Sequence, residues 1–465
     1  MPRYIKHIKA EGVLGRFDID QEFKQGVNVL YGKNGTGKTT LLHILANLLN
    51  GDYERFAFTE FNTIEATLDD NTTVLVSKYE SNRDSLIDVI VNNEKITESL
   101  SVNEIKKHES SKEFDFERKL ALGRPLTDYN DIDPILPVAY FPAFRTIIEA
   151  WGSAESKTMF TYNKQKIQRS STNFSRQLFG DFVPSLSYPS PIEIEIELSQ
   201  EIHKALSKIE YADREYFGNL LPSIFEILST NPHSSNDNFS SETENSDMIL
   251  EEINTLVKKL EKYPITTVPN VMQLRKSVSS FQAKEKSKGI AEQILDIYRK
   301  ALREVVVVQE ESFKKIETYL NSVNSFLEEK TIEISWIASI ERIVERKSIG
   351  IKFDVGQPEK ITSISRALSS GERQIVTLLY AATQMSKQQI VFIDEPEISL
   401  HVDWQRHLLK KMSEQLGERQ IIVCTHSPVI GADYEDEVII FEPKITCSSD
   451  SIMNENIFDE DNEEF

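Results

Sequence analysis

The sequence predicts an α/β fold in which both ends of the chain contribute strands to a mixed sheet and a helical segment is inserted between them. Near the N-terminus, an apolar β-prone segment precedes a glycine-rich loop and a helical segment. Near the C-terminus, two apolar segments each end in acidic or polar residues, which is typical of buried strands at the ligand-binding edge of a sheet. Between the two ends, apolar residues recur at helical spacing over a long stretch.

The glycine-rich loop predicts a phosphate-binding site between a strand at 27–31 and a helix at 39–49. Its glycines let the backbone present N–H groups to a phosphate, and the helix N-terminus adds partial positive charge. We expect Lys38 to reach the β- and γ-phosphates of a nucleoside triphosphate, and the Thr39 hydroxyl to ligate Mg²⁺. The predicted nucleotide-binding residues are Gly32, Lys33, Asn34, Gly35, Thr36, Gly37, Lys38, Thr39 and Thr40.

The two C-terminal strands predict the rest of the site. The strand at 389–393 leads into Asp394 and Glu395, the Walker B pattern, so we expect Asp394 to hold Mg²⁺ and Glu395 to polarise an attacking water. The strand at 420–425 leads into His426, which we expect to sense the γ-phosphate. The predicted catalytic residues are therefore Lys38, Glu395 and His426. A surface-capping acidic pair and a structural histidine are the alternatives.

The order of the motifs carries a family resemblance. The P-loop is followed by Leu-Ser-Ser-Gly-Glu at 368–372, Ile-Asp-Glu-Pro-Glu-Ile-Ser-Leu-His at 393–401 and Thr-His-Ser-Pro at 425–428. This order resembles the ABC-type ATPase clade shared by SMC, Rad50, RecF and OLD proteins, and its details resemble the OLD-like branch. The resemblance implies an ABC-type P-loop ATPase head that binds ATP and Mg²⁺, hydrolyses ATP and forms a homo-oligomer through its heads.

The same resemblance assigns residues that would act on the nucleotide of a neighbouring subunit. Ser369 and Gly371 would contact its γ-phosphate, and the D-loop at 399–401 would lie between the two sites. The segment at 140–145 stands where this family carries a glutamine, which leaves the role of Arg145 open. Capping of a helix N-terminus is the alternative for the signature serines. The predicted signature residues acting in trans are Ser369, Ser370, Gly371 and Glu372, and the D-loop residues are Ser399, Leu400 and His401.

The middle of the chain predicts a helical arm. Apolar residues follow helical spacing at 192–229, 250–260 and 290–312, which fits either a short coiled coil or a packed helical domain. Residues 230–247 are rich in Asn, Ser and Glu, and we expect them to be disordered. The predicted domains are 1–150 and 331–445 for the two halves of the head, 151–330 for the arm and 446–465 for an acidic tail.

Composition narrows the class of protein. In 465 residues, no apolar run reaches the length of a membrane span, the N-terminus lacks an apolar signal core, and two cysteines form no disulfide framework. We therefore expect a cytoplasmic protein that contacts no membrane. The net charge of −21 argues against non-specific coating of DNA. Basic and aromatic residues at 157–176 leave a local nucleic-acid groove, a docking surface and a solvated insertion as alternatives.

The C-terminal end bears on the partners. Only 39 residues follow His426, too few for the TOPRIM nuclease domain that OLD nucleases carry there. The layout resembles the ATPase subunits of two-gene bacterial anti-phage systems, PARIS first and Septu second. This resemblance implies a regulatory or scaffold ATPase that holds or activates a separate nuclease effector subunit and responds to a phage-encoded trigger protein. A RecF-like repair or recombination ATPase that binds DNA is the alternative.

Overall fold

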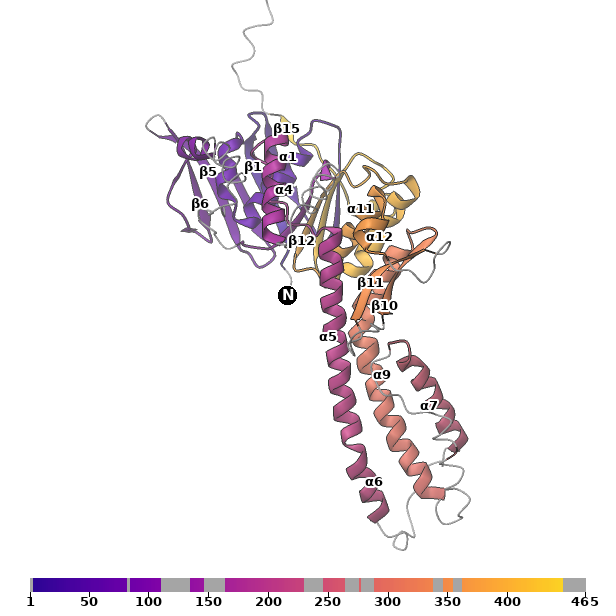
Figure 1. The fold of residues 1–465 in the computed structure, drawn as a ribbon. Helices are drawn as coiled ribbons and strands as arrows, with labels where there is room; N and C mark the ends of the chain where they lie inside the picture. The colour runs from indigo at the N-terminus through magenta and orange to yellow at the C-terminus, as the bar shows by residue number, and fades with distance from the viewer. Residues whose placement is uncertain are drawn as a thin grey trace, which may run out of the picture.

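The computed structural model describes residues 3–81, 84–109, 134–145, 164–229, 246–263, 276, 288–337, 346–353 and 362–445. These residues form a head of sheets and helices from which a long helical arm projects (Figure 1). The predicted α/β fold with an inserted helical arm is confirmed. No helix among the described residues is long and apolar enough to cross a bilayer.

The antiparallel sheet comes from the N-terminal part of the chain and one C-terminal strand. Its order is β15-β2-β1-β4-β5-β6-β7, and β8 also pairs with β6. Buried and accessible side chains alternate along β4, where Ile64, Ala66 and Leu68 face the core. The strands are β1 (Ile5–Val13), β2 (Phe17–Glu22), β4 (Thr63–Leu68), β5 (Thr73–Ser81), β6 (Asp84–Val91), β7 (Glu94–Lys95), β8 (Leu100–Ser101) and β15 (Lys444–Ile445).

The parallel sheet joins the two ends of the chain in the order β14-β3-β13-β12-β9. Every residue of β9, β12 and β13 is buried, as expected for parallel strands covered on both faces. The parallel and antiparallel strands of the predicted mixed sheet thus lie in two separate sheets. The strands are β3 (Gly26–Tyr31), β9 (Val138–Phe141), β12 (Ile390–Asp394), β13 (Gln420–Thr425) and β14 (Val438–Ile440).

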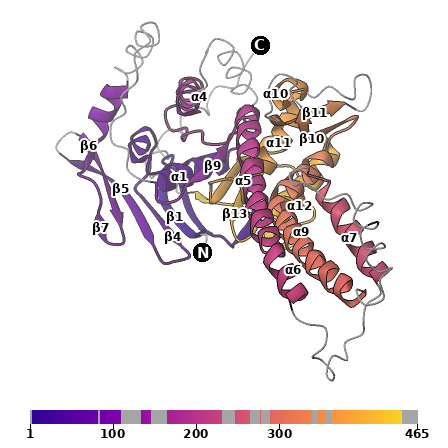
Figure 2. The same cartoon turned by 60° about the horizontal axis from the view of Figure 1, so that its bottom comes forward.

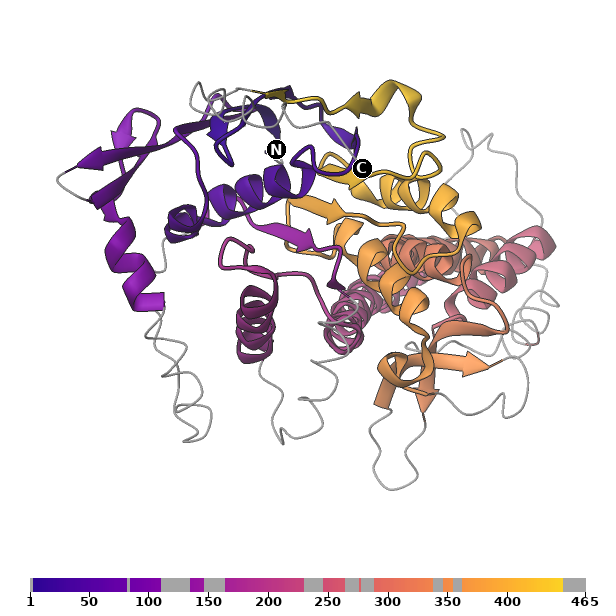
Figure 3. The same ribbon diagram turned by 90° about the horizontal axis from the view of Figure 1, so that it is seen from above.

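Helices of the head pack on the parallel strands and on one another. The helix after the P-loop, α1 (Lys38–Asn50), contacts β9, β12 and β13 and lies between the two sheets when the head is seen from above (Figure 3). On α1, apolar side chains such as Leu41, Ile44 and Leu45 are fully buried. The helices α11 (Ser370–Ala382) and α12 (Val402–Leu416) pack against each other, and α12 also contacts β3.

The arm is a packed hairpin of long helices with a third helix beside it. α5 (Pro191–Gly218) leaves the head and continues as α6 (Leu220–Ser229), while α9 (Lys288–Asn324) returns alongside α5 (Figures 1 and 2). α7 (Ser246–Leu260) packs on α9. The 37 residues of α9 correspond to a length of about 55 Å at 1.5 Å per residue.

The base of the arm enters the head next to α11. The Tyr319 hydroxyl of α9 donates to the carbonyl of Val376 in α11 at 3.0 Å, and Phe326 packs edge-on against Trp404 of α12. After α9, β10 (Lys330–Ile337) pairs with β11 (Arg346–Phe353), and the short α10 (Ile364–Ala367) precedes the signature segment. The predicted boundary between 330 and 331 falls at the start of β10.

Several of the predicted segments lie wholly or partly outside the residues that the structure describes. Residues 157–163, 230–245 and 446–465 lie outside them. The remainder of the basic segment lies in α4 (Lys164–Phe179), where Arg176 forms a partly buried ion pair with Asp52 at 2.7 Å. Asp52 also lies beside Arg55, which pairs with Glu109. Arg176 therefore connects α4 to the segment that follows α1.

Candidate functional site

The parallel sheet brings the predicted motifs to one edge. In the register of the sheet, Asp394 at the end of β12 lies opposite Cys424 of β13, and Tyr31 at the end of β3 lies opposite Thr425. The loops that follow these three strands therefore start side by side, although the loop after β3 is more than 300 positions from the other two in sequence. The structure brings Lys38, Thr39, Asp394, Glu395 and His426 together at this edge.

Lys38 closes the P-loop from within. Its Nζ donates to the carbonyl of Gly32 at 2.7 Å and to that of Lys33 at 3.0 Å, and it lies 3.3 Å from His426 Nδ1. The loop needs glycine at two kinds of position. Gly37 has φ 90°, in the left-handed region, and a Cβ on Gly32 would stand 2.9 Å from the carbonyl oxygen of Phe441.

Asp394 and Thr39 form a ligand pair that suits Mg²⁺. The Thr39 hydroxyl donates to Asp394 Oδ2 at 2.9 Å, while Asp394 Oδ1 is buried and has no hydrogen-bond partner among the described residues. Burial raises the pKa of Asp394 to about 6, which shows how strongly this position disfavours an uncompensated negative charge. A hard cation held by carboxylate and hydroxyl oxygens would compensate that charge, so the residues present fit Mg²⁺.

Glu395 lies next to His426 in a strained backbone position. Glu395 has φ 48°, and its Oε1 lies 2.8 Å from His426 Nε2. Burial, together with a hydrogen bond and the negative charge of Glu397, raises the pKa of Glu395 to about 8. A carboxylate with a pKa near the working pH is suited to accept a proton from water.

Arg145 supports the backbone of the acidic loop. Its side chain is fully buried, and its guanidinium donates to the carbonyls of Asp394 at 3.1 Å and Glu395 at 3.2 Å. It also donates to the carbonyls of Pro142, Pro396 and Ile398. The role that the sequence left open for Arg145 is thus to fix the chain after β12. The sequence signal was a single basic residue directly after the apolar segment that forms β9.

Glu397 is a second residue of the site that the sequence motifs did not identify. Its Oε1 accepts hydrogen bonds from the Thr425 hydroxyl at 2.7 Å and from the backbone N–H groups of His426 and Ser427, each at 3.1 Å. One carboxylate oxygen thereby binds the whole loop that carries His426. The available signal was that Glu397 shares the Walker B segment with Asp394 and Glu395.

Within one chain, the signature segment forms a helix cap. The Ser369 hydroxyl accepts from Glu372 N at 3.4 Å, and Glu372 Oε2 accepts from Ser369 N at 2.7 Å, which is a capping box at the start of α11. Glu372 also pairs with Lys330 at 2.9 Å. Ser369 and Ser370 are exposed, so this capping leaves them accessible to a neighbouring subunit, and their action in trans stays a prediction.

Gly371 is packed against the D-loop of its own chain. A Cβ at this position would stand 2.8 Å from the carbonyl oxygen of Ser399, closer than real side chains approach. Ser399 itself has φ 69°. The glycine is therefore required by a contact inside the chain. In the D-loop, Leu400 is buried, whereas Ser399 and His401 are exposed.

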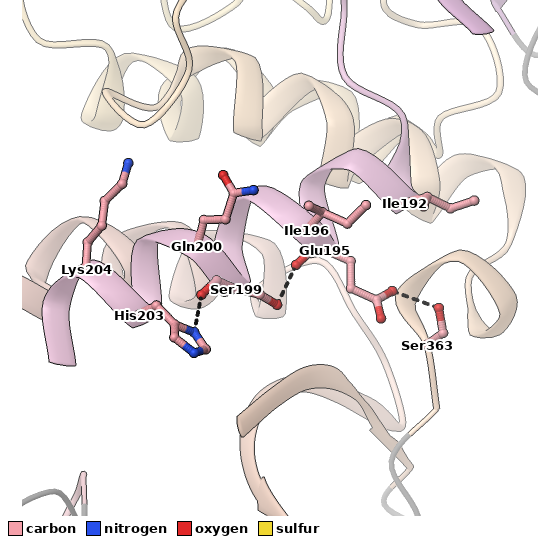
Figure 4. Close-up of a pocket in the computed structure, with 8 residues that line it drawn as sticks. All are labelled: Ile192, Glu195, Ile196, Ser199, Gln200, His203, Lys204 and Ser363. Atoms are coloured by element: carbon pink, nitrogen blue, oxygen red, sulfur yellow. Dashed lines mark hydrogen bonds between the residues drawn. The ribbon is translucent and has the colours of Figure 1, made fainter. Parts of the chain in front are cut away.

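The arm also holds the segment that leads into the signature. On α5, Glu195 Oε2 accepts from the Ser363 hydroxyl at 2.7 Å and from Ile364 N at 3.1 Å, at the start of α10. Figure 4 shows Glu195 pointing toward Ser363 at one side of a pocket along α5. Glu195 at the start of the arm therefore contacts the segment that leads into the signature, and Lys330 at its end contacts Glu372 of the signature itself.

Comparison with known proteins gives a match over most of the chain. Residues 27–433 match the family described as "AAA domain, putative AbiEii toxin, Type IV TA system". The hemin import ATP-binding protein HmuV of Escherichia coli O157:H7 is 32% identical over 83 residues, or 17% of this chain. The chain spans about a third of the length of that curated relative.

Two solved structures resemble the chain weakly over nearly its full length. The Smc head domain with an extended coiled coil, derived from Pyrococcus furiosus and bound to the C-terminal domain of ScpA, is 14% identical, with a TM-score of 0.38 and 96% of each chain covered. The recombination mediator protein RecF in its "ATPrS" form is 12% identical, with a TM-score of 0.32 and coverage of 96% of this chain and 99% of that one. Similarity at this level carries no conclusion about function.

Proposed function

We propose that the edge of the parallel sheet is where this chain hydrolyses ATP. The chain belongs to the AAA-domain family that matches residues 27–433 and is an ABC-type P-loop ATPase. The observation that carries this proposal is one set of contacts. Lys38 lies beside His426, His426 beside Glu395, and Thr39 beside Asp394, each within hydrogen-bond reach. The residues that bind phosphate are thus next to the residues that would activate water.

Each residue has a role that its position supports. The P-loop N–H groups and Lys38 bind the phosphates once Lys38 leaves the loop carbonyls. Thr39 and Asp394 would hold Mg²⁺, which would neutralise charge that develops on the transferred phosphoryl group. Glu395 accepts the proton of the attacking water in its deprotonated form, and His426 orients the Glu395 carboxylate through the 2.8 Å contact.

The catalytic unit that we propose is a pair of chains. The exposed signature serines lie next to an exposed part of the D-loop, because Gly371 packs directly against Ser399. This surface also exposes Ile398, at 40%, and Val402, at 55%, beside Ser399 and His401. In a homo-oligomer that pairs through its heads, this surface would contact the γ-phosphate bound to the other chain.

The shared site can be tested at Ser370. Ser370 is exposed at the N-terminus of α11, where a negative charge is favourable for its own helix but repels a phosphate of the other chain. We expect Ser370→Glu and Lys38→Ala each to be inactive, and their equal mixture to recover up to about a quarter of the wild-type ATPase rate, since half of the pairs carry one intact site.

The matched control is Ser207→Glu, which adds the same charge on the exposed face of α5. It should hydrolyse ATP like the wild type. A mixture as inactive as its two components would contradict the shared site. So would a protein that stays monomeric with ATP and hydrolyses it at a rate per chain that does not depend on protein concentration.

We further propose that the protein is the ATPase subunit of a two-gene bacterial anti-phage system, in which it holds or activates a separate nuclease effector. The support is the resemblance of the motifs and layout to such subunits. The family description adds a toxin of a type IV toxin–antitoxin system, another setting in which two gene products act together. A RecF-like ATPase that binds DNA is the alternative function.

Co-expression with the neighbouring gene separates the two functions. We expect the neighbouring gene product to co-purify with the chain, and its toxicity on phage infection to require Lys38 and Glu395, because ATP must bias the complex between two states. The chain purified alone with ATP and Mg²⁺ should cut neither DNA nor RNA. Salt-dependent binding of duplex DNA by the isolated protein, without a stable partner, would instead favour the RecF-like function.

A further inference from the structure

The strongest unassigned feature of the head is the contact between the D-loop and the loop that carries His426. Glu397 lies two residues before the D-loop, and its Oε1 accepts three hydrogen bonds from residues 425–427. Two of the three donors are backbone N–H groups, so Glu397 fixes the path of the main chain as well as a side chain. A carboxylate that accepts several hydrogen bonds holds its partners more firmly than a neutral acceptor does.

A side chain of α12 forms a second link between the same two loops. Gln405 Nε2 donates to the carbonyl of Leu400 at 3.0 Å and to that of Glu397 at 3.4 Å. Gln405 Oε1 accepts from the Ser427 hydroxyl at 3.1 Å. The D-loop and the His426 loop are thus connected twice, through Glu397 and through Gln405.

The two loops face different parts of the proposed active unit. The D-loop carries the exposed Ser399 and His401, which the proposed function places against a second chain. The other loop carries His426, which contacts both Lys38 and Glu395. We propose that Glu397 is a positioning residue that couples these loops, so that docking of a second chain at the D-loop orients His426 against Glu395. This inference rests on the proposed ATPase function.

Two substitutions separate the hydrogen bonds from the charge. Glu397→Gln keeps an acceptor oxygen for residues 425–427 and removes the charge, whereas Glu397→Ala removes both. We expect Glu397→Ala to lower kcat by about tenfold or more while the Kd for a fluorescent ATP analogue changes by less than about twofold. We expect Glu397→Gln to lose less of kcat than Glu397→Ala, because it keeps an acceptor for the same three donors. Glu414→Ala and Glu414→Gln, at an exposed carboxylate of α12, are the matched controls.

The outcomes distinguish this inference from the proposed function. A wild-type kcat in Glu397→Ala, an equal loss in both Glu397 variants, or a parallel loss of nucleotide binding would overturn the coupling. An inactive wild-type protein would instead refute the ATPase function. In that case amide hydrogen exchange still tests the coupling, because Glu397→Ala should speed exchange at His426 and Ser427 and Glu397→Gln should not. Unchanged exchange in Glu397→Ala would overturn it independently.

Discussion

Glu395→Gln will bind ATP as the wild type does and will hydrolyse it more slowly by about a hundredfold or more. The substitution keeps the shape of the side chain and leaves an amide beside His426, but it removes the group that accepts a proton from water. Lys38→Ala, in contrast, should weaken ATP binding itself. In the structure the Lys38 ammonium group binds the loop carbonyls, and we expect it to bind phosphate instead when ATP is present. The substitution removes that ammonium group.

Steady-state ATPase assays and equilibrium binding of a fluorescent ATP analogue measure these two effects separately. If Glu395→Gln hydrolysed ATP at the wild-type rate, Glu395 would not be the base. If Lys38→Ala bound ATP as tightly as the wild type, Lys38 would not contribute to phosphate binding.

Replacing Arg145 by Met should destabilise the head by about 3 kcal/mol or more, because five carbonyl contacts, four of them buried, lose their donor and each contributes on the order of 1 kcal/mol. Met roughly preserves the length of the side chain, so the loss reports hydrogen bonding more than packing. Denaturant unfolding measures the change, and Arg406→Met on the exposed face of α12 is the control.

Arg145→Lys refines this test. A lysine keeps the charge but cannot reproduce the planar fork of donors, so its stability should lie between those of the wild type and Arg145→Met. A midpoint for Arg145→Met within experimental error of the wild type would show that Arg145 does not hold the loop after β12.

The site residues that could be predicted from the sequence are those that lie in short contiguous motifs. Asp394 ends one apolar strand, His426 follows another directly, and Lys38, in the P-loop, follows a third. The geometry of a parallel sheet therefore brings them together once the strands are recognised. The arm helices were predictable for a similar reason, because long apolar stripes at helical spacing leave little ambiguity. The bounds of α5, α7 and α9 differ from the predicted stretches mainly at their ends.

The roles of Arg145 and Glu397 could not be derived in this way. Both side chains bind main-chain atoms of other segments, and a backbone carbonyl or N–H group leaves no trace in the residue type that carries it. The same holds for Gly371. A glycine in a signature motif predicts close approach of something, but only the fold shows that the Ser399 carbonyl of the same chain is what approaches.

Because α9 is one continuous helix, a rotation at its base is transmitted along the whole length of the arm. Its base is fixed to α11 through Tyr319, and from there it continues as a single helix for about 47 Å. A rotation of about 10° at the head would displace the far end of the arm by roughly 8 Å, since displacement grows in proportion to length. A small rotation within the head would thus produce a displacement of several ångströms at the far end of the arm. A partner bound at the far end of the arm would therefore move when the signature helix α11 moves.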